Sequence, residues 1–350
     1  MLSFKEFIDI ERLIHSFKTA IACLLGFLLS RLIGLPADQW VVITIIVVMC
    51  AQIYVGSVMQ KAYLRFLGTI FGCLFAMVTI VAVGDSGLAV AVTIVISSFI
   101  FSYFATMNES FTYAGTLGAV TTTIIMLGET PTMTFAAERF LEISVGLLIA
   151  TLVSQFILPI HARTHLRRTQ ASTLELLRDY FTAVTSTSAE TIAMTDYQEL
   201  DDNIGKSIIK QRALAKESKN ELFGVAFNAD IFMQCLACER GILRSMTFIQ
   251  YAYAHLQRVN TDLLKNLALH HFNETILTTL DTFINVIQRG KKEDDHIHSA
   301  DMMTLRDQIQ QQSPGLSQDA QLYVDGLLFS AEILVNNLTM LARLYFLPIK

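Results

Sequence analysis

The sequence predicts an all-α polytopic membrane protein with six transmembrane helices followed by a helical cytoplasmic domain. Only 16% of the 350 residues are charged, and a mean hydropathy of +0.47 is too apolar for an ordinary soluble protein. The long apolar runs lie before about residue 160, whereas the remainder shows the periodicity of water-exposed helices. We therefore expect a six-span transmembrane domain over residues 1–160 and a cytoplasmic α-helical domain over residues 161–350.

Each predicted span approaches the roughly 20 residues that a helix needs to cross about 30 Å of hydrocarbon. The expected spans are 18–35, 40–58, 65–83, 87–106, 111–128 and 140–159. Residues 1–18 alternate charged and apolar positions at helical spacing, which predicts an amphipathic helix at the membrane surface. A signal peptide is disfavoured, because no small-residue cleavage site follows the apolar run and Arg31 interrupts its end.

The distribution of lysine and arginine predicts the orientation. One side carries Lys5, Arg12, Lys18, Lys61, Arg65, Arg163, Arg167, Arg168 and Arg178. The other side carries Arg31 and Arg139. Because cytoplasmic loops are enriched in these residues, both termini are expected in the cytoplasm.

The stretch from Lys61 to Ala76 combines two cations with a row of small residues. Gly68, Gly72 and Ala76 recur every fourth residue and so form one face of a helix. The same spacing occurs in the other two groups, Ala22, Gly26 and Ser30, and Gly146, Ala150 and Ser154. Such faces let helices approach closely in lipid. We expect close helix packing there, with one of the three faces left for a second subunit.

The fifth span carries a different face, made of Thr112, Thr116 and Thr123. Threonine hydroxyls inside a membrane either bond back to carbonyls of their own helix or line water. The sequence leaves both alternatives open.

Ionisable residues near the span ends are the candidates for a transport path, because intramembrane charges are costly and often functional. They include Arg31, Lys61, Arg65, Glu109, Glu138, Arg139 and Glu142. Snorkelling of the side chain to the membrane surface is the alternative. Glu142 shares a face with Gly146, Ala150 and Ser154.

No motif predicts an enzyme or a cofactor site. The sequence lacks a Walker loop, a G-x-G-x-x-G, an H-E-x-x-H and a nucleophile elbow. Cys235 and Cys238 form a lone C-x-x-C inside a helical pattern, which favours ordinary packing over a metal site. The net charge of −5 gives no indication of a nucleic-acid partner.

The C-terminal part shows further helical segments. Periodicity predicts helices at about 166–184, 197–222, 228–268, 271–288 and 317–346, arranged as a bundle. Ser317 is a candidate N-cap for the last of them. The polar interval from Arg289 to Gly315 is interpreted as a partly mobile loop.

Several of these residues together resemble the fusaric acid resistance and aromatic acid exporter family. The similar residues are His15-x-x-Lys18-Thr19-Ala20, Leu35-Pro36 before Trp40, Arg65-x-x-Gly68-Thr69-x-x-Gly72, Arg139-Phe-Leu-Glu142-x-x-x-Gly146 and Leu158-Pro159. Plant aluminium-activated malate transporters are distantly similar. The resemblance covers residues 10–170 and implies passage of organic, often aromatic, carboxylates across a bacterial inner membrane.

Two departures from the family pattern bear on this expectation. Many members repeat the whole unit, whereas this chain has one copy, which predicts a homodimer. The proline often found after Gln at the end of the second span is absent, since the chain reads Cys50-Ala51-Gln52-Ile53.

The leading hypothesis is a proton-coupled exporter of organic anions. Lys61 and Arg65 would attract the carboxylate on the cytoplasmic side, Arg31 or Arg139 would serve at the far end, and Glu142 is the candidate proton site. The alternatives are a passive anion channel of the same fold and a membrane scaffold that acts through its cytoplasmic domain. A periplasmic adaptor protein is left open as a partner.

Overall fold

The computed structural model describes residues 10–83, 86–128, 131–186, 194–221, 227–259, 261–313 and 316–349. These ranges are almost wholly helical, and their strand-like pairing is a single parallel bridge between Ile297 and Ile349. The chain divides into two compact units. The first comprises residues 1–162 and 220–224, and the second comprises residues 163–219 and 225–350.

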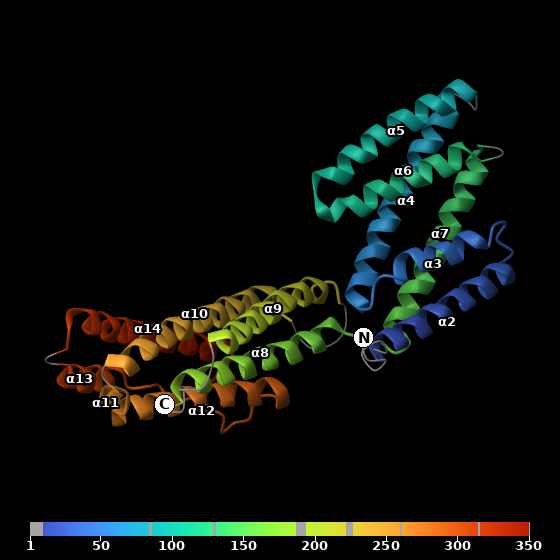
Figure 1. Ribbon diagram of the computed structural model, residues 1–350. Coiled ribbons are helices and arrows are strands. Elements are labelled where there is room, and N and C mark those ends of the chain that lie inside the picture. Colours follow the sequence, from blue (N-terminus) through green and yellow to red (C-terminus); the bar gives the residue numbers. More distant parts are fainter. Residues whose placement is uncertain are drawn as a thin grey trace. The chain divides into compact units, whose positions relative to one another are not determined.

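The first unit is a bundle of helices (Figure 1). They are α2 (Ile10–Ile33), α3 (Gln39–Met49), α4 (Val55–Val83), α5 (Gly87–Met107), α6 (Glu109–Met126) and α7 (Met133–Phe156). Helices α2, α3 and α7 pack on one another, α4 packs on both α7 and α6, and α5 packs on α6. Helix α4 therefore connects an α2–α3–α7 group to an α5–α6 pair.

The second predicted span is wrong in its bounds. Helix α3 ends at Met49 instead of near residue 58, and α4 begins at Val55 instead of near residue 65. At a rise of 1.5 Å per residue, an 11-residue helix is about 16 Å long, roughly half of the hydrocarbon thickness. Apolar residues flank the break on both sides, so composition could not reveal it. A tertiary contact supports the start of α4, because Val55 N donates to the Ile160 carbonyl at 3.1 Å.

The small-residue faces lie in contacts within the chain. A Cβ added to Gly68 would lie 2.5 Å from the Ala114 carbonyl oxygen of α6. A Cβ on Gly146 would lie 2.8 Å from the Val41 carbonyl oxygen of α3. Ala22, Gly26, Ser30, Gly72, Ala76, Ala150 and Ser154 are buried as well. The expectation that one face remains for a second subunit is therefore wrong, because helices of the same chain cover all three.

The outer surface of the first unit is strongly apolar. Large aliphatic and aromatic side chains are exposed along α2 and α5, including Leu32 at 84% and Phe99 at 75%. Four helices of the described chain are long and apolar enough to cross a membrane, namely Ile10–Ile33, Val55–Ala82, Gly87–Met107 and Gln318–Leu344. Helix α3 and residues Phe111–Met126 are apolar but shorter. A surface of this kind is stable against lipid and unfavourable in water.

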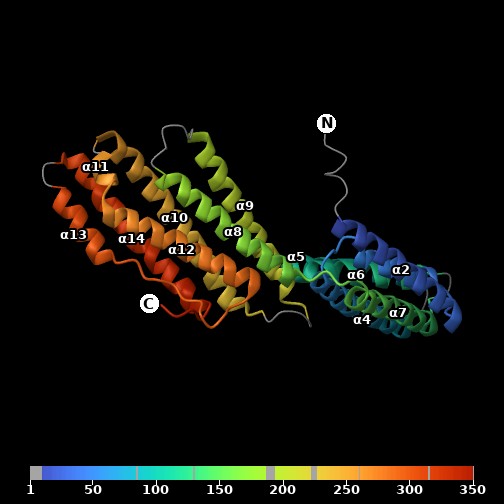
Figure 2. The ribbon, with the colours of Figure 1, turned by 90° about the horizontal axis from the view of Figure 1, so that it is seen from below.

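The second unit is a separate helical bundle (Figure 2). Its helices are α8 (Ala162–Thr185), α9 (Met194–Ser218), α10 (Ala229–Val259), α11 (Thr261–Leu264), α12 (Leu267–Arg289), α13 (Met302–Gln312) and α14 (Gln318–Leu344). Helix α14, although long and apolar, buries one face along α10. The predicted Ser317 cap is present, since its side chain accepts from Ala320 N at 3.2 Å.

The interpretation of residues 289–315 as a loop is wrong in part. Helix α13 occupies Met302–Gln312 and buries Leu305 and Ile309. Asp301 begins this helix by accepting from the backbone N–H groups of Met303 and Thr304. The polar composition of the segment concealed a helix with two buried positions and an aspartate cap.

Candidate functional site

An ion pair lies inside the first unit at the start of α3. Arg139 and Glu142 are one turn apart on α7, and their Nη1 and Oε2 atoms are 2.8 Å apart. Both side chains are almost fully buried, with 4% and 0% of their surfaces exposed. Glu142 also accepts from Ala37 N at 2.9 Å, so its carboxylate lies at the N-terminal end of α3, where the helix dipole favours negative charge. The guanidinium lies over the rings of Trp40 and Phe135.

A second buried cation, Arg65, lies against the middle of α3. Its Nη2 donates to Thr44 Oγ1 at 3.4 Å, and it also hydrogen-bonds to the Tyr113 hydroxyl. That hydroxyl donates in turn to the Val47 carbonyl at 3.3 Å. Lys61 Nζ lies 5.4 Å from the centre of the Tyr113 ring. The structure thus brings the two predicted cations of α4 to one tyrosine of α6.

The other predicted residues lie elsewhere. Arg31 is exposed and forms an ion pair with Asp38 at 3.1 Å. Each hydroxyl of the threonine face donates to a carbonyl: Thr112 to Ala105, Thr116 to Thr112, and Thr123 to Ala119. Thr116 and Thr123 therefore bond back to carbonyls of their own helix, which is one of the two alternatives that the sequence left open, whereas Thr112 donates to α5. The side chain of Glu109 lies outside the described residues.

Sequence reasoning missed two buried residues on α2. The sequence predicts Lys18 at the membrane surface, but its side chain is fully buried, and its Nζ has no hydrogen-bond partner among the described residues. His15, one turn earlier, is buried against the backbone of Met49 and Cys50 at the end of α3. Helical spacing could have revealed that both residues are buried, because residues 15, 18, 22, 26 and 30 form the buried face of α2.

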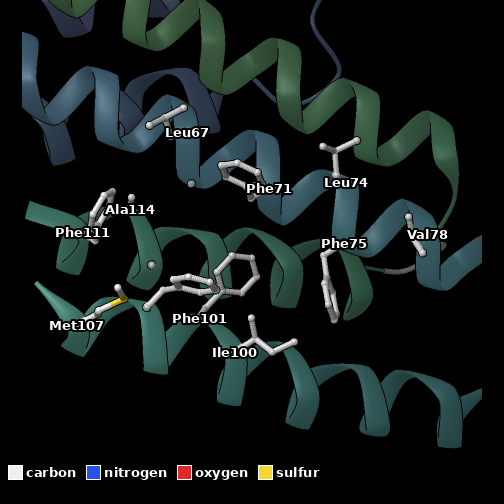
Figure 3. A pocket seen from close by; sticks show the side chains of 13 residues that line it. Leu67, Phe71, Leu74, Phe75, Val78, Ile100, Phe101, Met107, Phe111 and Ala114 are labelled. Atoms are coloured by element: carbon white, nitrogen blue, oxygen red, sulfur yellow. The ribbon is translucent and has the colours of Figure 1, made fainter.

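An apolar pocket of about 650 Å³ lies between α4, α5 and α6. Phenylalanines from all three helices line it, as Figure 3 shows for Phe71, Phe75, Phe101 and Phe111. Polar side chains do not line this pocket. A volume of this size holds one small organic molecule with an apolar body.

The fold and these residues define a class of protein: a polytopic helical membrane protein with charged side chains buried inside an apolar bundle. The chain belongs to the fusaric acid resistance protein family, whose model matches residues 12–343. It is also similar to the inner membrane protein YeeA of Escherichia coli (strain K12), with 28% identity over 141 residues. That match spans 40% of this chain and 40% of YeeA.

Proposed function

We propose that the protein exports organic carboxylates with an aromatic or similarly apolar body across the bacterial inner membrane, coupled to the proton gradient. The pocket between α4, α5 and α6 is the observation that supports this substrate class most directly. Its phenylalanines suit an aromatic ring, because offset and edge-to-face ring pairs add to the gain from burial.

The cations of α4 supply the partner for the carboxylate. Lys61 lies six residues before Leu67, the first pocket residue of α4, which is about 9 Å along the helix axis. Tyr113, over which Lys61 lies, directly precedes Ala114, another pocket residue. A bound aromatic acid would place its ring among the phenylalanines and direct its carboxylate toward Lys61. Arg65 would then receive the carboxylate on its way through the unit.

The proposed proton site is Glu142. Binding of a proton to this carboxylate would change the charge of the buried ion pair with Arg139 during the transport cycle. Arg31, exposed beside Asp38, would serve at the exit. In this scheme the first unit spans the membrane six times, and both termini and the second unit are cytoplasmic. The working form is a homodimer.

Transport by purified protein in liposomes tests the proposal. With an imposed pH gradient, the account predicts that benzoate accumulates on the acidic side, because export exchanges the anion for a proton. Protein-free liposomes should show only the passive accumulation of benzoic acid on the alkaline side, and the neutral analogue benzamide should not accumulate. Lys61→Met should lower the initial rate at least tenfold. Benzoate flux that only runs down its gradient would instead identify a passive channel, and no protein-dependent flux would contradict transport of this substrate class.

A further inference from the structure

The buried charges of the first unit do not balance. Within the described parts of helices α2 to α7, the fully or almost fully buried charged side chains are Lys18, Arg65, Arg139 and Glu142. Glu142 neutralises Arg139. Arg65 has hydrogen-bond partners in Thr44 and Tyr113. Lys18 is left as a buried ammonium group whose Nζ has no hydrogen-bond partner in the described part of the chain.

The position of Lys18 is beside the break between α3 and α4. One turn further along α2, Ala22 packs in the same apolar cluster as Val48 and Met49, which end α3. One turn earlier, His15 lies against the backbone of Met49 and Cys50. The backbone at the end of α3 therefore lies against His15, and within the described residues it supplies no hydrogen bond to Lys18.

An unpaired buried cation is expensive. Removing an ammonium ion from water costs several kcal/mol even after the protein relaxes, and it is offset only by a close counter-charge or several hydrogen bonds. A helix end contributes at most about 2 kcal/mol of that compensation. In this conformation the ammonium group of Lys18 has no counter-charge, so it remains able to bind an anion.

We propose that Lys18 is a second binding position for the carboxylate of the transported anion, distinct from the pocket beside Lys61. This inference rests on the proposed function. The ammonium group offers three donors and a compact charge, which fits one carboxylate oxygen or a small inorganic anion. Residues 50–54 follow the end of α3, and the N–H groups of Cys50 and Gln52 already donate to the carbonyls of Ile46 and Met49, so Lys18 itself supplies the donors for the anion.

The non-helical segment between α3 and α4 explains how an anion reaches the fully buried Lys18. Val55, which follows this non-helical segment, donates to the carbonyl of Ile160, the residue after the last predicted span. In the proposed scheme the segment therefore lies toward the cytoplasmic surface, from which the anion enters. Lys18 is closed to solvent in this structure. Movement of the segment 50–54 away from α2 would open it, and the substrate's negative charge would stabilise that open form.

Thermal unfolding of the full-length protein in detergent tests the proposal with Lys18→Met, which keeps the length of the side chain and removes its charge. Benzoate, acetate and chloride serve as the anions, and benzamide is the neutral control. Lys210→Met, at an exposed lysine of α9, is the matched control variant. If Lys18→Met gives no folded protein, Lys18→Gln carries the same comparison.

The proposal predicts two results. Without added anion, Lys18→Met should have a Tm equal to or above that of the natural protein, because an uncompensated charge is removed. With benzoate, its Tm shift should fall to less than half of the natural shift, whereas Lys210→Met should retain the full shift. An unchanged benzoate shift in Lys18→Met would overturn the proposal.

Failure of the proposed function has a different signature. If acetate and chloride raise the Tm in a Lys18-dependent way but no carboxylate crosses the liposome membrane, the anion site stands and the transport proposal falls. If benzoate is transported and stabilises Lys18→Met as much as the natural protein, transport stands and the role of Lys18 falls.

Discussion

At the scale of the residue, the first unit is organised by where its buried charges find partners. Helix α3 has a carboxylate, Glu142, at its start and a histidine, His15, at its end. The position of Glu142 matches the sign of the helix dipole, which is positive at the N-terminus. The start of this short helix is therefore stabilised electrostatically by a residue of α7, whereas its end packs against a residue of α2.

The variant Glu142→Gln should separate transport from the proton gradient. The amide cannot take up a proton and cannot neutralise Arg139, so export should lose its dependence on pH. Initial rates of benzoate flux in liposomes between pH 5.5 and 8 would measure this. A pH profile identical to that of the natural protein would remove Glu142 from the coupling step.

The second unit contains a buried carboxylate that should make its stability depend on pH. Glu239 of α10 is fully enclosed, and it accepts from Gln211 at 2.7 Å and Gln170 at 3.3 Å. Burial is the main cause that raises the pKa of Glu239 from 4.5 to about 7. Between these two values the folded state holds a proton that the unfolded state has released. Stability is therefore highest below about pH 4.5 and falls by about 3 kcal/mol as the pH rises through 7.

Glu239→Gln should remove this dependence, because an amide of the same shape does not titrate. Amide hydrogen exchange along α10, compared between variant and natural protein at each pH, reports the opening free energy. Protection should be greater in the variant at pH 8 and similar at pH 5. The exposed Glu199→Gln is the control. A difference between Glu239→Gln and the natural protein that is constant from pH 5 to 8 would contradict the account.

At the scale of the element, close contact between α4 and α6 depends on glycine. A Cβ on Gly72 would lie 2.7 Å from the Gly118 carbonyl oxygen and 2.9 Å from Thr121 Cβ. Thr122 Oγ1 also donates to the Gly72 carbonyl at 3.1 Å, which holds the two backbones together. Neither helix can yield locally, because the contacts involve backbone atoms.

Gly72→Ala should therefore lower stability by about 1–3 kcal/mol. Gly205→Ala on α9 is the opposite case, since nothing lies within 4 Å of its added Cβ. That change should raise stability by about 0.5–1 kcal/mol through a lower entropy cost of folding. The Tm of each variant in detergent measures both effects. Equal shifts in the two variants would mean that the α4–α6 contact is looser than described.

The sequence predicted the helices well but could not predict where one apolar run breaks. Periodicity and length identify α5 and α6 because polar residues separate these helices. The break between α3 and α4 has apolar residues on both sides and depends on a distant partner, Ile160. Lys18 was misplaced for a related reason: a cation before an apolar run suggests a surface position unless its neighbours in space are known.

At the scale of the whole molecule, the exposed residues of the pocket between α4, α5 and α6 give a reason to expect a second copy of the chain. Phe71, Leu74 and Phe104 line the pocket and are each more than half exposed. In a lone copy the bound ring would therefore contact lipid. A partner subunit over α4 and α5 would separate the substrate from lipid and complete the binding position.

We expect a homodimer on this ground. Native mass measurement in mild detergent should give twice the 39.1 kDa of one chain. Phe71→Glu should give monomers, since the carboxylate would have to be buried in the apolar contact. A natural protein that is monomeric and still transports in liposomes holding one chain each would exclude the dimer.

The central claim is that an aromatic carboxylate binds between α4, α5 and α6. Photo-crosslinking of the full-length protein with 4-azidobenzoate, followed by mass mapping of the labelled peptides, tests it most directly. The account predicts adducts on the pocket residues of these helices, above all Phe71, Phe75 and Phe101, and loss of the adducts when excess benzoate competes. Labelling confined to the second unit, or labelling of the pocket that benzoate does not reduce, would contradict the account.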